Sequence, residues 1–518
     1  MKNITLLKAK VGILAVSCLS ITTLFACVDK DARSDLSPNL PTDQAQNGDF
    51  GDQGGGSDQG LNFPVFDDGV LAFPGAEGYG KNVTGARAGE GREIYHVTNL
   101  NDAGPGSFRD AVSKPWRIIV FDVSGVIKLS SNPIVLKSNQ TILGHTAPGD
   151  GIVLYNGRVS ASGAQNLIVR YLRIRMGAAY PSELDACGVA NGADMIFDHC
   201  SMTWGRDECF SINPDGKGTA PKNITIQNSI IGQGLQNHSC GGLMQTDISN
   251  GCTIFRNLYI DNKTRNPKVK GLNQFVNNVV YNWGSGAAYN MGGDSSGKSE
   301  TTIENNYFIV GPCNNWQNVE IAPKVYEAQQ VPMNPARPFT GGNSDFRSYC
   351  KGNYYDYDKD GALNGIEITE VNWSQYCSGS PTLLEARSDL HPIIRSQKSA
   401  QEAYEWVVEK VGAYLPVRDE VDKYLIDELT SLGGKGTIIQ DERKTEQFPL
   451  GGPGTINAAQ KPLDSDNDDA FEDAWGLDKY DPTDAVKEAK NGYLNIENYA
   501  LSLEYPDEYE YELNKNKQ

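Results

Sequence analysis

The sequence predicts an all-β chain built around a parallel β-solenoid, followed by a short helical extension and an acidic tail. Between about residues 118 and 310, short runs rich in β-branched and aromatic residues recur, and Gly, Asn, Asp and Ser separate them. No helical pattern fills the gaps, which disfavours units of alternating strand and helix. Fifty-five glycines among 518 residues indicate many turns and argue against a helical bundle. Repeated strands of this kind are typical of a solenoid, whose coils bury their inner faces by stacking.

When the runs are aligned, one position is polar or aromatic in each of them. The aligned residues, at steps of 28, 29, 29, 21 and 28, are Tyr171, His199, Asn228, Asn257, Asn278 and Asn306. Stacked asparagines can satisfy each other's amide donors and acceptors, which removes the cost of burying them. A sandwich or barrel would not place a polar group at the same point of every strand. We therefore expect these side chains to form one inward-facing column.

The first 26 residues are typical of an export signal. Three lysines and no acid precede an apolar run of about fifteen residues, Val11–Phe25, which is too short for a confident membrane span. The sequence Leu24-Phe25-Ala26-Cys27 resembles a bacterial lipobox. We expect Cys27 to be lipidated and to anchor the exported chain at an outer membrane, at the cell surface or facing the periplasm. Ordinary signal cleavage followed by secretion is the alternative.

The remaining patterns divide the chain. The predicted segments are a signal peptide (1–26), a flexible acidic Gly-rich tether (27–65), the solenoid (66–390), a mixed helical extension packed on it (391–460) and an acidic, calcium-binding tail (461–518). In the extension, helical spacing is seen at Ala403, Trp406, Val407, Lys410 and Val411, and again at Val421, Tyr424, Leu425 and Leu429.

Charge and cysteine content narrow the possible functions. The formal net charge is 46 − 65 = −19, which excludes a nucleic-acid binder with its basic stripes. It also disfavours an anionic substrate unless a bound cation intervenes. Ten cysteines minus Cys18 and Cys27 leave eight in an oxidising compartment. Among these, Cys350 and Cys377 bracket a loop and are the better candidates for a disulfide.

Acidic residues lie on both sides of the strand-like run at residues 195–200. Asp185 stands about one coil before Asp207 and Glu208, and residues one coil apart in a solenoid lie about 5 Å from each other. Their carboxylates can therefore converge on one face. Clustered oxygens without a nearby His or Cys suit a hard cation, Ca²⁺ above all. A solvated acidic edge is the alternative.

A basic segment stands out in this acidic chain. Lys263, Arg265, Lys268 and Lys270 fall within eight residues, around Pro267, which breaks the strand. Basic side chains facing an acidic cluster suggest an anionic substrate that a metal bridges on one side and Arg or Lys holds on the other. A charge-balancing turn is the alternative.

The ordered motifs of the chain resemble polysaccharide lyase family 1, the pectate and pectin lyases. These motifs are Gly78-Tyr79-Gly80, Tyr95-His-Val-Thr-Asn-Leu-Asn-Asp102, Gly104-Pro-Gly-Ser-Phe-Arg109, Ile119-Val-Phe-Asp-Val-Ser-Gly125, Thr141-Ile-Leu-Gly-His-Thr-Ala-Pro-Gly149, Phe197-Asp-His199 and Arg265-Asn-Pro267. The resemblance runs over about residues 70 to 310 and implies a right-handed parallel β-helix. The later segments look like the C-terminal extension of Bacteroidetes members.

The resemblance also implies roles for individual residues. Asp185 and Asp207 match calcium-binding aspartates, and Arg265 matches the arginine that removes the C5 proton of a galacturonate. Lys270 matches a cation that holds the substrate carboxylate. Two positions depart from the family pattern: its third carboxylate is Ser211 here, so Glu208 is expected to replace it. Its substrate-gripping lysine aligns near Gln236, so His238 or Lys268 is expected to substitute.

The implied function is calcium-assisted β-elimination of α-1,4-linked polygalacturonate by a monomer, giving 4,5-unsaturated oligogalacturonides. Arginine is an unusual base because its pKa lies far above neutrality, although partial burial and the neighbouring Lys268 and Lys270 could lower it. The alternatives are a pectin lyase acting on methylated homogalacturonan, a polygalacturonase-like hydrolase, and a non-catalytic pectin-binding surface lipoprotein. The hydrolase would need paired acids with defined separation, and no such motif is apparent.

Two further calcium candidates are weaker. Asp356, Asp358, Asp360 and Glu367, with Gly361, match the spacing of an EF-hand loop, although their flanks do not resemble helices. In the tail, Asp464-Ser-Asp466-Asn-Asp468-Asp469 looks like an Asp-rich calcium segment without the usual Gly.

Overall fold

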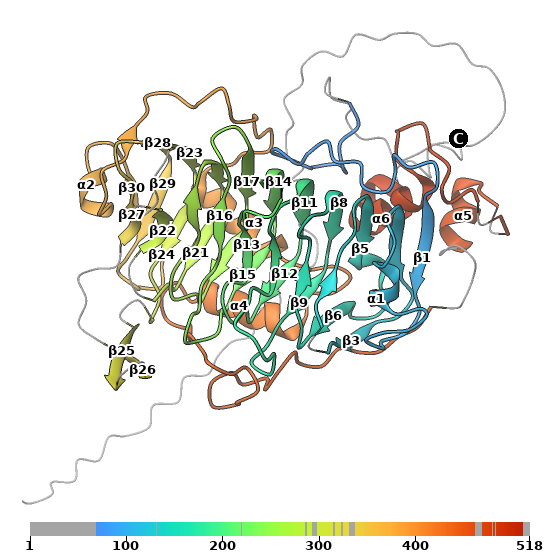
Figure 1. Cartoon of the computed structure of the whole chain (residues 1–518), viewed down its shortest axis with the longest axis horizontal. Helices are drawn as coiled ribbons and strands as arrows, with labels where there is room; N and C mark the ends of the chain where they lie inside the picture. Colours follow the sequence, from blue (N-terminus) through green and yellow to red (C-terminus); the bar gives the residue numbers. More distant parts are fainter. Residues whose placement is uncertain are drawn as a thin grey trace, which may run out of the picture. The chain divides into compact units, whose positions relative to one another are not determined.

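Three sheets of short, mainly parallel strands form the framework of the described chain, which confirms the predicted all-β parallel β-helix (Figure 1). The computed structural model describes residues 69–510, apart from residues 131, 219, 285–286, 293–297, 314–315, 323–324, 331–336, 462–468, 479 and 482; for residues 287, 316–322, 325–330 and 469–470 it describes the backbone alone. The predicted signal peptide with Cys27, and the tether, lie outside the described residues.

From β2 to β24, each coil of the solenoid contributes one strand to each sheet, so sheet neighbours in this part are three strands apart in the chain. The first sheet contains β1 Glu93–Val97, β2 Arg117–Phe121, β5 Gln140–Leu143, β8 Gln165–Arg170, β11 Ala193–Asp198, β14 Lys222–Gln227, β17 Gly251–Phe255, β20 Leu272–Val276, β23 Ser299–Glu304, β28 Phe346–Lys351 and β31 Thr382–Leu383. The second contains β4 Ile134–Val135, β7 Val159–Ser160, β10 Cys187–Val189, β13 Phe210–Ile212, β16 Leu243–Gln245, β19 Lys268–Lys270, β22 Ala287–Met291 and β27 Arg337–Gly341. The third contains β3 Gly125–Lys128, β6 Ile152–Tyr155, β9 Arg173–Arg175, β12 Ser201–Thr203, β15 Ile230–Gly232, β18 Leu258–Ile260, β21 Val279–Tyr281, β24 Tyr307–Ile309, β29 Asn353–Asp356 and β30 Ile366–Ile368.

The remaining elements are an antiparallel pair of strands, a 3₁₀ turn and the helices. They are the antiparallel pair β25 Trp316–Ala322 and β26 Val325–Gln330, the 3₁₀ turn Gly144–Thr146, and the helices α1 Phe108–Ala111, α2 Trp373–Tyr376, α3 Ala400–Lys410, α4 Glu420–Thr430, α5 Asp469–Trp475 and α6 Asn495–Glu504. Among the helices that the structure describes, none has the length and apolar character needed to cross a membrane.

The six side chains predicted to form one column belong to two adjacent columns. For Tyr171, His199 and Asn228, the predicted alignment is therefore wrong by one residue. Asn257, Asn278 and Asn306 form an inward ladder that continues to Asn353: Asn278 Oδ1 accepts from Asn257 N at 2.9 Å, and Asn353 Oδ1 accepts from Asn306 Nδ2 at 2.8 Å. Tyr171, His199 and Asn228 instead share a neighbouring column with Arg256, Asn277 and Asn305, all in the left-handed backbone region.

The shift by one residue has a local cause. Each bend between the first and third sheets needs one left-handed residue, followed by one whose side chain points inward. Asparagine tolerates the left-handed region better than most residues and also suits the inward ladder. Where both positions are Asn, as at Asn277 and Asn278, the sequence alone does not distinguish them. His199 therefore lies outside the coil, where its ring stacks on Tyr171 at 4.7 Å and its Nδ1 lies 3.2 Å from Gly412 O.

Replacing Asn278 by alanine should lower the free energy of unfolding by about 1–3 kcal/mol, the cost of leaving buried polar partners unsatisfied. The Asn278 amide donates to Ile254 O at 2.9 Å and accepts from Asn257 N at 2.9 Å, and alanine removes both bonds. Asn364→Ala, at an exposed amide, is the matched control and should change little. Chemical denaturation followed by circular dichroism measures both variants, and equal stabilities would contradict the role of the ladder.

The predicted helical extension packs on the third sheet. Val407 of α3 and Leu425 and Leu429 of α4 share an apolar cluster with strand residues that include Leu258 and Val279. Ser399 caps α3 through a capping box with Glu402, and Asp419 caps α4. Both helices therefore begin after a residue type that is favoured at the N-cap position.

The segment predicted as an acidic tail contains α5 and α6, and the residues of α6 from Asn495 to Ser502 are buried. Leu494 and Leu501 pack with the outward side chains Ile168 and Ile196 of the first sheet, so those strands are buried on both faces. The Asp-rich run Asp464–Asp468 lies outside the described residues.

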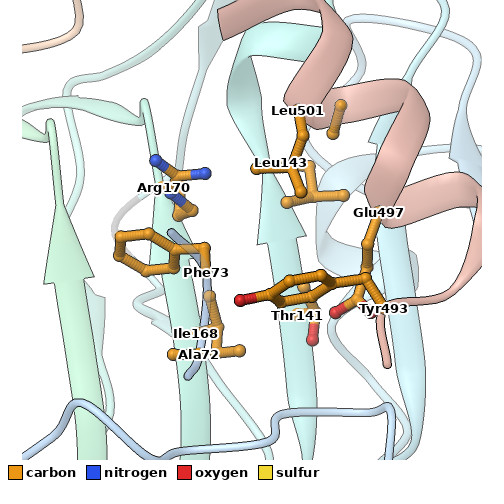
Figure 2. A pocket seen from close by; sticks show the side chains of 10 residues that line it. Ala72, Phe73, Thr141, Leu143, Ile168, Arg170, Tyr493, Glu497 and Leu501 are labelled. Carbon is orange, nitrogen blue, oxygen red and sulfur yellow. The ribbon is translucent and has the colours of Figure 1, made fainter. Parts of the chain in front are cut away.

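Figure 2 shows the small cavity between α6 and strands β5 and β8. Two charged side chains, Arg170 and Glu497, line it together with apolar ones. Arg170 is paired with Asp198 and Glu504, and Glu497 with Arg87, so both charges are neutralised inside the protein. The cavity therefore belongs to the packing of α6.

The described cysteines are free thiols. The disulfide suggested for Cys350 and Cys377 is wrong in this structure. Cys350 belongs to β28 of the first sheet, whereas Cys377 pairs with Phe339 of the second.

Candidate active site and metal centre

The acidic and basic segments meet at one edge of the second sheet. Asp185 stands just before β10, Glu208 just before β13 and Arg265 just before β19. Ala186 N donates to Glu208 O at 2.9 Å, and parallel bridges join Glu208 to Cys240 and Cys240 to Thr264. The coils thus stack these residues in a row, as the coil spacing predicts for Asp185 and Glu208.

Asp185, Asp207 and Glu208 form a carboxylate cluster in which one oxygen of each lies within 4.8 Å of the others. Burial raises the pKa of Asp185, and burial together with the neighbouring Asp185 raises the pKa of Glu208 to about 9. Three acids held this closely repel one another unless positive charge is added. The oxygen-only donor set fits Ca²⁺, as the sequence predicts.

Two further side chains contact the cluster, and one of them, Arg265, supplies positive charge. His238 Nε2 lies 2.8 Å from Asp207 Oδ1, and this contact lowers the pKa of Asp207. Arg265 Nη1 pairs with Glu208 Oε1. His238, predicted to bind substrate, therefore contacts a predicted metal ligand in this structure.

Arg265 is half-buried and its backbone is left-handed, with φ of 57°. Burial acts to lower the pKa of its guanidinium, but the neighbouring Cys240 and Glu208 outweigh burial and hold the pKa above its usual value. The expectation that nearby cations lower this pKa is therefore wrong for the structure as described. Part of the reason is that the acidic side chain of Glu208 contacts Arg265 directly.

The predicted substrate-binding lysines project from the same strand face. Lys268 and Lys270 flank the core residue Val269 of β19, and alternate residues of a strand point the same way. Both lysines are half-buried. Gln236, the further candidate, is half-buried, and neither its Oε1 nor its Nε2 has a hydrogen-bond partner among the described residues. Both polar atoms of its amide are themselves buried.

Ser211 does not join the carboxylate cluster. Its side chain is buried on β13, and its Oγ accepts a hydrogen bond from Leu243 N at 3.2 Å. Glu208 instead provides the third carboxylate, as expected from the departure at this position.

The EF-hand-like residues are brought together only in part: burial and the neighbouring Asp358 and Asp360 raise the pKa of Asp356 to about 6. Asp356 ends β29, whereas Glu367 is exposed on β30, which pairs antiparallel with β29. Asp360 Oδ1 accepts from Ala362 N at 2.8 Å, so it serves a local turn. Asp356, Asp358, Asp360 and Glu367 form no group of three within 4.8 Å, unlike the clusters found elsewhere in the described chain. The geometry gives this weaker calcium site no support.

Sequence reasoning missed two neighbours of the cluster. Arg158, one coil before Asp185, acts on that carboxylate by its charge. Cys240 lies between Glu208 and Thr264 in the row. Because the steps from Glu208 to Cys240 and from Cys240 to Thr264 are 32 and 24 residues, no constant period could have revealed their alignment.

Comparison with known proteins shows the family of the chain. Residues 75–328 match the family model described as pectate lyase. A probable pectate lyase C of Aspergillus fumigatus is 48% identical over 437 residues, which cover 84% of this chain and 94% of that protein. The chain belongs to the pectate lyase family. It is therefore a polysaccharide lyase.

Other pectate lyases have similar or lower sequence identity to this chain. A probable pectate lyase C of Aspergillus terreus is 49% identical over 436 residues, with 84% of this chain and 94% of that protein covered. The solved structure of a Bacillus subtilis pectate lyase mutant is 15% identical and covers 67% of this chain and 99% of its own, with a TM-score of 0.46.

These relatives contradict the predicted outer-membrane location. Relatives that are about half identical to this chain are from Aspergillus species, which are fungi and have no bacterial outer membrane. The prediction of a lipid-anchored outer-membrane protein is accordingly wrong.

Proposed function

We propose that this pectate lyase cleaves α-1,4-linked polygalacturonate by calcium-assisted β-elimination and releases 4,5-unsaturated oligogalacturonides. Arg265 is proposed as the base at C5. The observation that carries the proposal is the contact between a three-carboxylate cluster and a guanidinium at one sheet edge. The relatives named probable pectate lyase C support the same activity.

The proposed chemistry assigns a task to each group. Asp185, Asp207 and Glu208 would hold Ca²⁺, which supplies the positive charge that makes the C5 proton of a bound uronate more acidic. Arg265 lies beside this cluster and would accept that proton as a neutral guanidine, after it has released a proton of its own to solvent. Lys268 and Lys270, on the neighbouring strand, would bind substrate carboxylates as point charges. The half-buried Gln236 amide would bind a sugar hydroxyl, while His238 would orient Asp207.

The proposal needs a single chain, since all of these groups come from one solenoid, and we propose a monomer. The boundaries of the solenoid (66–390), the extension (391–460) and the C-terminal segment (461–518) stay predictions.

Removing calcium with EDTA should abolish the rise in ultraviolet absorbance that accompanies formation of the unsaturated product from polygalacturonate. Asp185→Ala should raise the calcium concentration needed for half-maximal rate by about tenfold or more, because a site with fewer charged ligands binds Ca²⁺ more weakly. Asp345→Ala, an exposed acid outside the cluster, is the control and should leave the calcium dependence unchanged.

Other outcomes of this assay would reject the proposal. Reducing ends without ultraviolet absorbance would mean hydrolysis. Turnover that is indifferent to EDTA and faster on methylated polymer would point to a pectin lyase.

A further inference from the structure

A second group of metal-ligating side chains overlaps the carboxylate cluster but differs from it in chemistry. Glu208, His238 and Cys240 each offer one ligand atom, and the carboxylate oxygen, imidazole nitrogen and Sγ all lie within 4.8 Å of one another. Glu208 and Cys240 are bridged on adjacent coils, and His238 stands two residues before Cys240. One oxygen, one nitrogen and one sulfur therefore face a common point.

The loop that carries His238 and Cys240 is held from both sides. Ser239, between them, is left-handed with φ of 51°, and its N–H donates to Leu235 O at 2.8 Å. Its Oγ accepts from Lys263 N at 3.1 Å. On the other side, Gln236 N donates to Ile439 O of the extension at 2.9 Å. The loop is therefore fixed to a neighbouring coil and to the extension, which favours a preorganised site.

We propose that Glu208, His238 and Cys240 bind a thiophilic divalent cation of the Zn²⁺ type. Carboxylate, imidazole and thiolate are the ligands that Zn²⁺ takes in proteins, and three protein ligands leave a fourth position for water. On binding, the Cys240 S–H bond breaks, Sγ bonds to the metal and the proton passes to solvent. The site differs from the carboxylate cluster in its donor atoms. The carboxylate cluster offers only oxygens, which suit the hard cation Ca²⁺, whereas this site adds nitrogen and sulfur.

Burial and access are both compatible with metal binding. The Cys240 side chain is buried, whereas His238 keeps 41% of its side chain exposed and gives the metal a route from solvent. The other mixed cluster, Asp198, His199 and Glu504, already holds Arg170 through both of its carboxylates. In the proposed site the one carboxylate, Glu208, is paired with Arg265, and a cation would displace this partly exposed guanidinium, whereas in the other cluster it would have to displace the buried Arg170.

The shared Glu208 couples the two sites. A Zn²⁺-type ion would take Glu208 away from the Asp185–Asp207 pair, and it would draw His238 away from Asp207. The two cations should therefore compete, and the thiophilic ion should inhibit the lyase. The inhibition rests on the proposed function, whereas the site itself does not.

Cobalt(II) is the probe, because a Co²⁺–thiolate bond gives a charge-transfer band in the near ultraviolet. Titrating the metal-free protein with Co²⁺ should produce this band at one equivalent. Cys240→Ser should abolish it, and His238→Gln should weaken Co²⁺ binding by more than the roughly 10- to 100-fold that loss of an outer-shell partner costs. Added Ca²⁺ should raise the Co²⁺ concentration needed for half-saturation.

Cys252→Ser is the matched control and should keep the band. Cys252 is a buried free thiol that hydrogen-bonds Asn273 Oδ1, and serine can replace this bond. Circular dichroism checks the fold of each variant, and the half-exposed His238 tests the site even if Cys240→Ser misfolds. No band in the wild type, or an undiminished band in a folded Cys240→Ser, would overturn the site. A Co²⁺ affinity indifferent to Ca²⁺ would overturn the sharing of Glu208.

Discussion

Replacing Arg265 by alanine should lower kcat on polygalacturonate by about 10²–10⁴-fold, the range that a positioned base contributes. The expected loss follows from the place of Arg265 beside the carboxylate cluster, where a substrate uronate held by calcium would present its C5 proton. Product formation is measured by ultraviolet absorbance at saturating calcium.

A second variant separates chemistry from structure. Arg265 also neutralises the buried Glu208, so alanine leaves that carboxylate without its partner. Arg265→Lys keeps a positive charge but loses the planar guanidinium, and it should preserve the fold while still losing most of the activity. Arg347→Ala, an exposed arginine on β28, is the control. Full activity in a folded Arg265→Ala would place the base elsewhere.

Replacing Arg175 by methionine should cost about 3–5 kcal/mol of stability, the usual effect of removing one partner from a buried ion pair. Arg175 is fully buried on β9, and its Nη2 lies 2.7 Å from Asp419 Oδ2 and 2.9 Å from Asp422 Oδ1. Methionine fills a similar space but leaves Asp422 without its counter-charge in an apolar interior. Urea denaturation measures the loss in free energy of unfolding. In limited proteolysis, the extension near α4 should be cut earlier in the variant than in the wild type.

An exposed arginine of the same sheet system provides the comparison. Arg347 keeps 57% of its side chain exposed and lies 3.7 Å from Glu300, so Arg347→Met should cost less than about 1 kcal/mol. Similar losses in the two variants would mean that the buried network does not hold the extension to the solenoid.

The extension also affects the site. Ile439 and Phe448 pack with Trp204 and Leu235, and Ile439 O accepts the hydrogen bond from Gln236 N. The loop with Gln236 and His238 is thus braced by residues about 200 positions later in the chain. The similarity to the Aspergillus relatives extends over 437 residues and so reaches beyond the family model at 75–328.

Much of the fold follows from local patterns in the sequence. The recurring apolar strands and the absence of helices between them predicted the stacked coils, and the helical spacing around Val407 and around Leu425 predicted α3 and α4. The existence of an inward asparagine ladder was predicted correctly. The assignment of Tyr171, His199 and Asn228 to it was wrong by one residue. A single residue decides which side of the coil wall a side chain faces, and residue type alone does not reveal it.

The sequence by itself determined the solenoid, the family motifs and the convergence of Asp185, Asp207 and Glu208, because stacked coils bring residues of successive repeats together whatever else surrounds them. Only the tertiary structure decided the partners of these groups. Arg265 against Glu208, His238 against Asp207, and Cys240 in the same row depend on coils of unequal length and on side-chain directions. Such contacts carry no fixed spacing in the sequence, and they set the charge of the site.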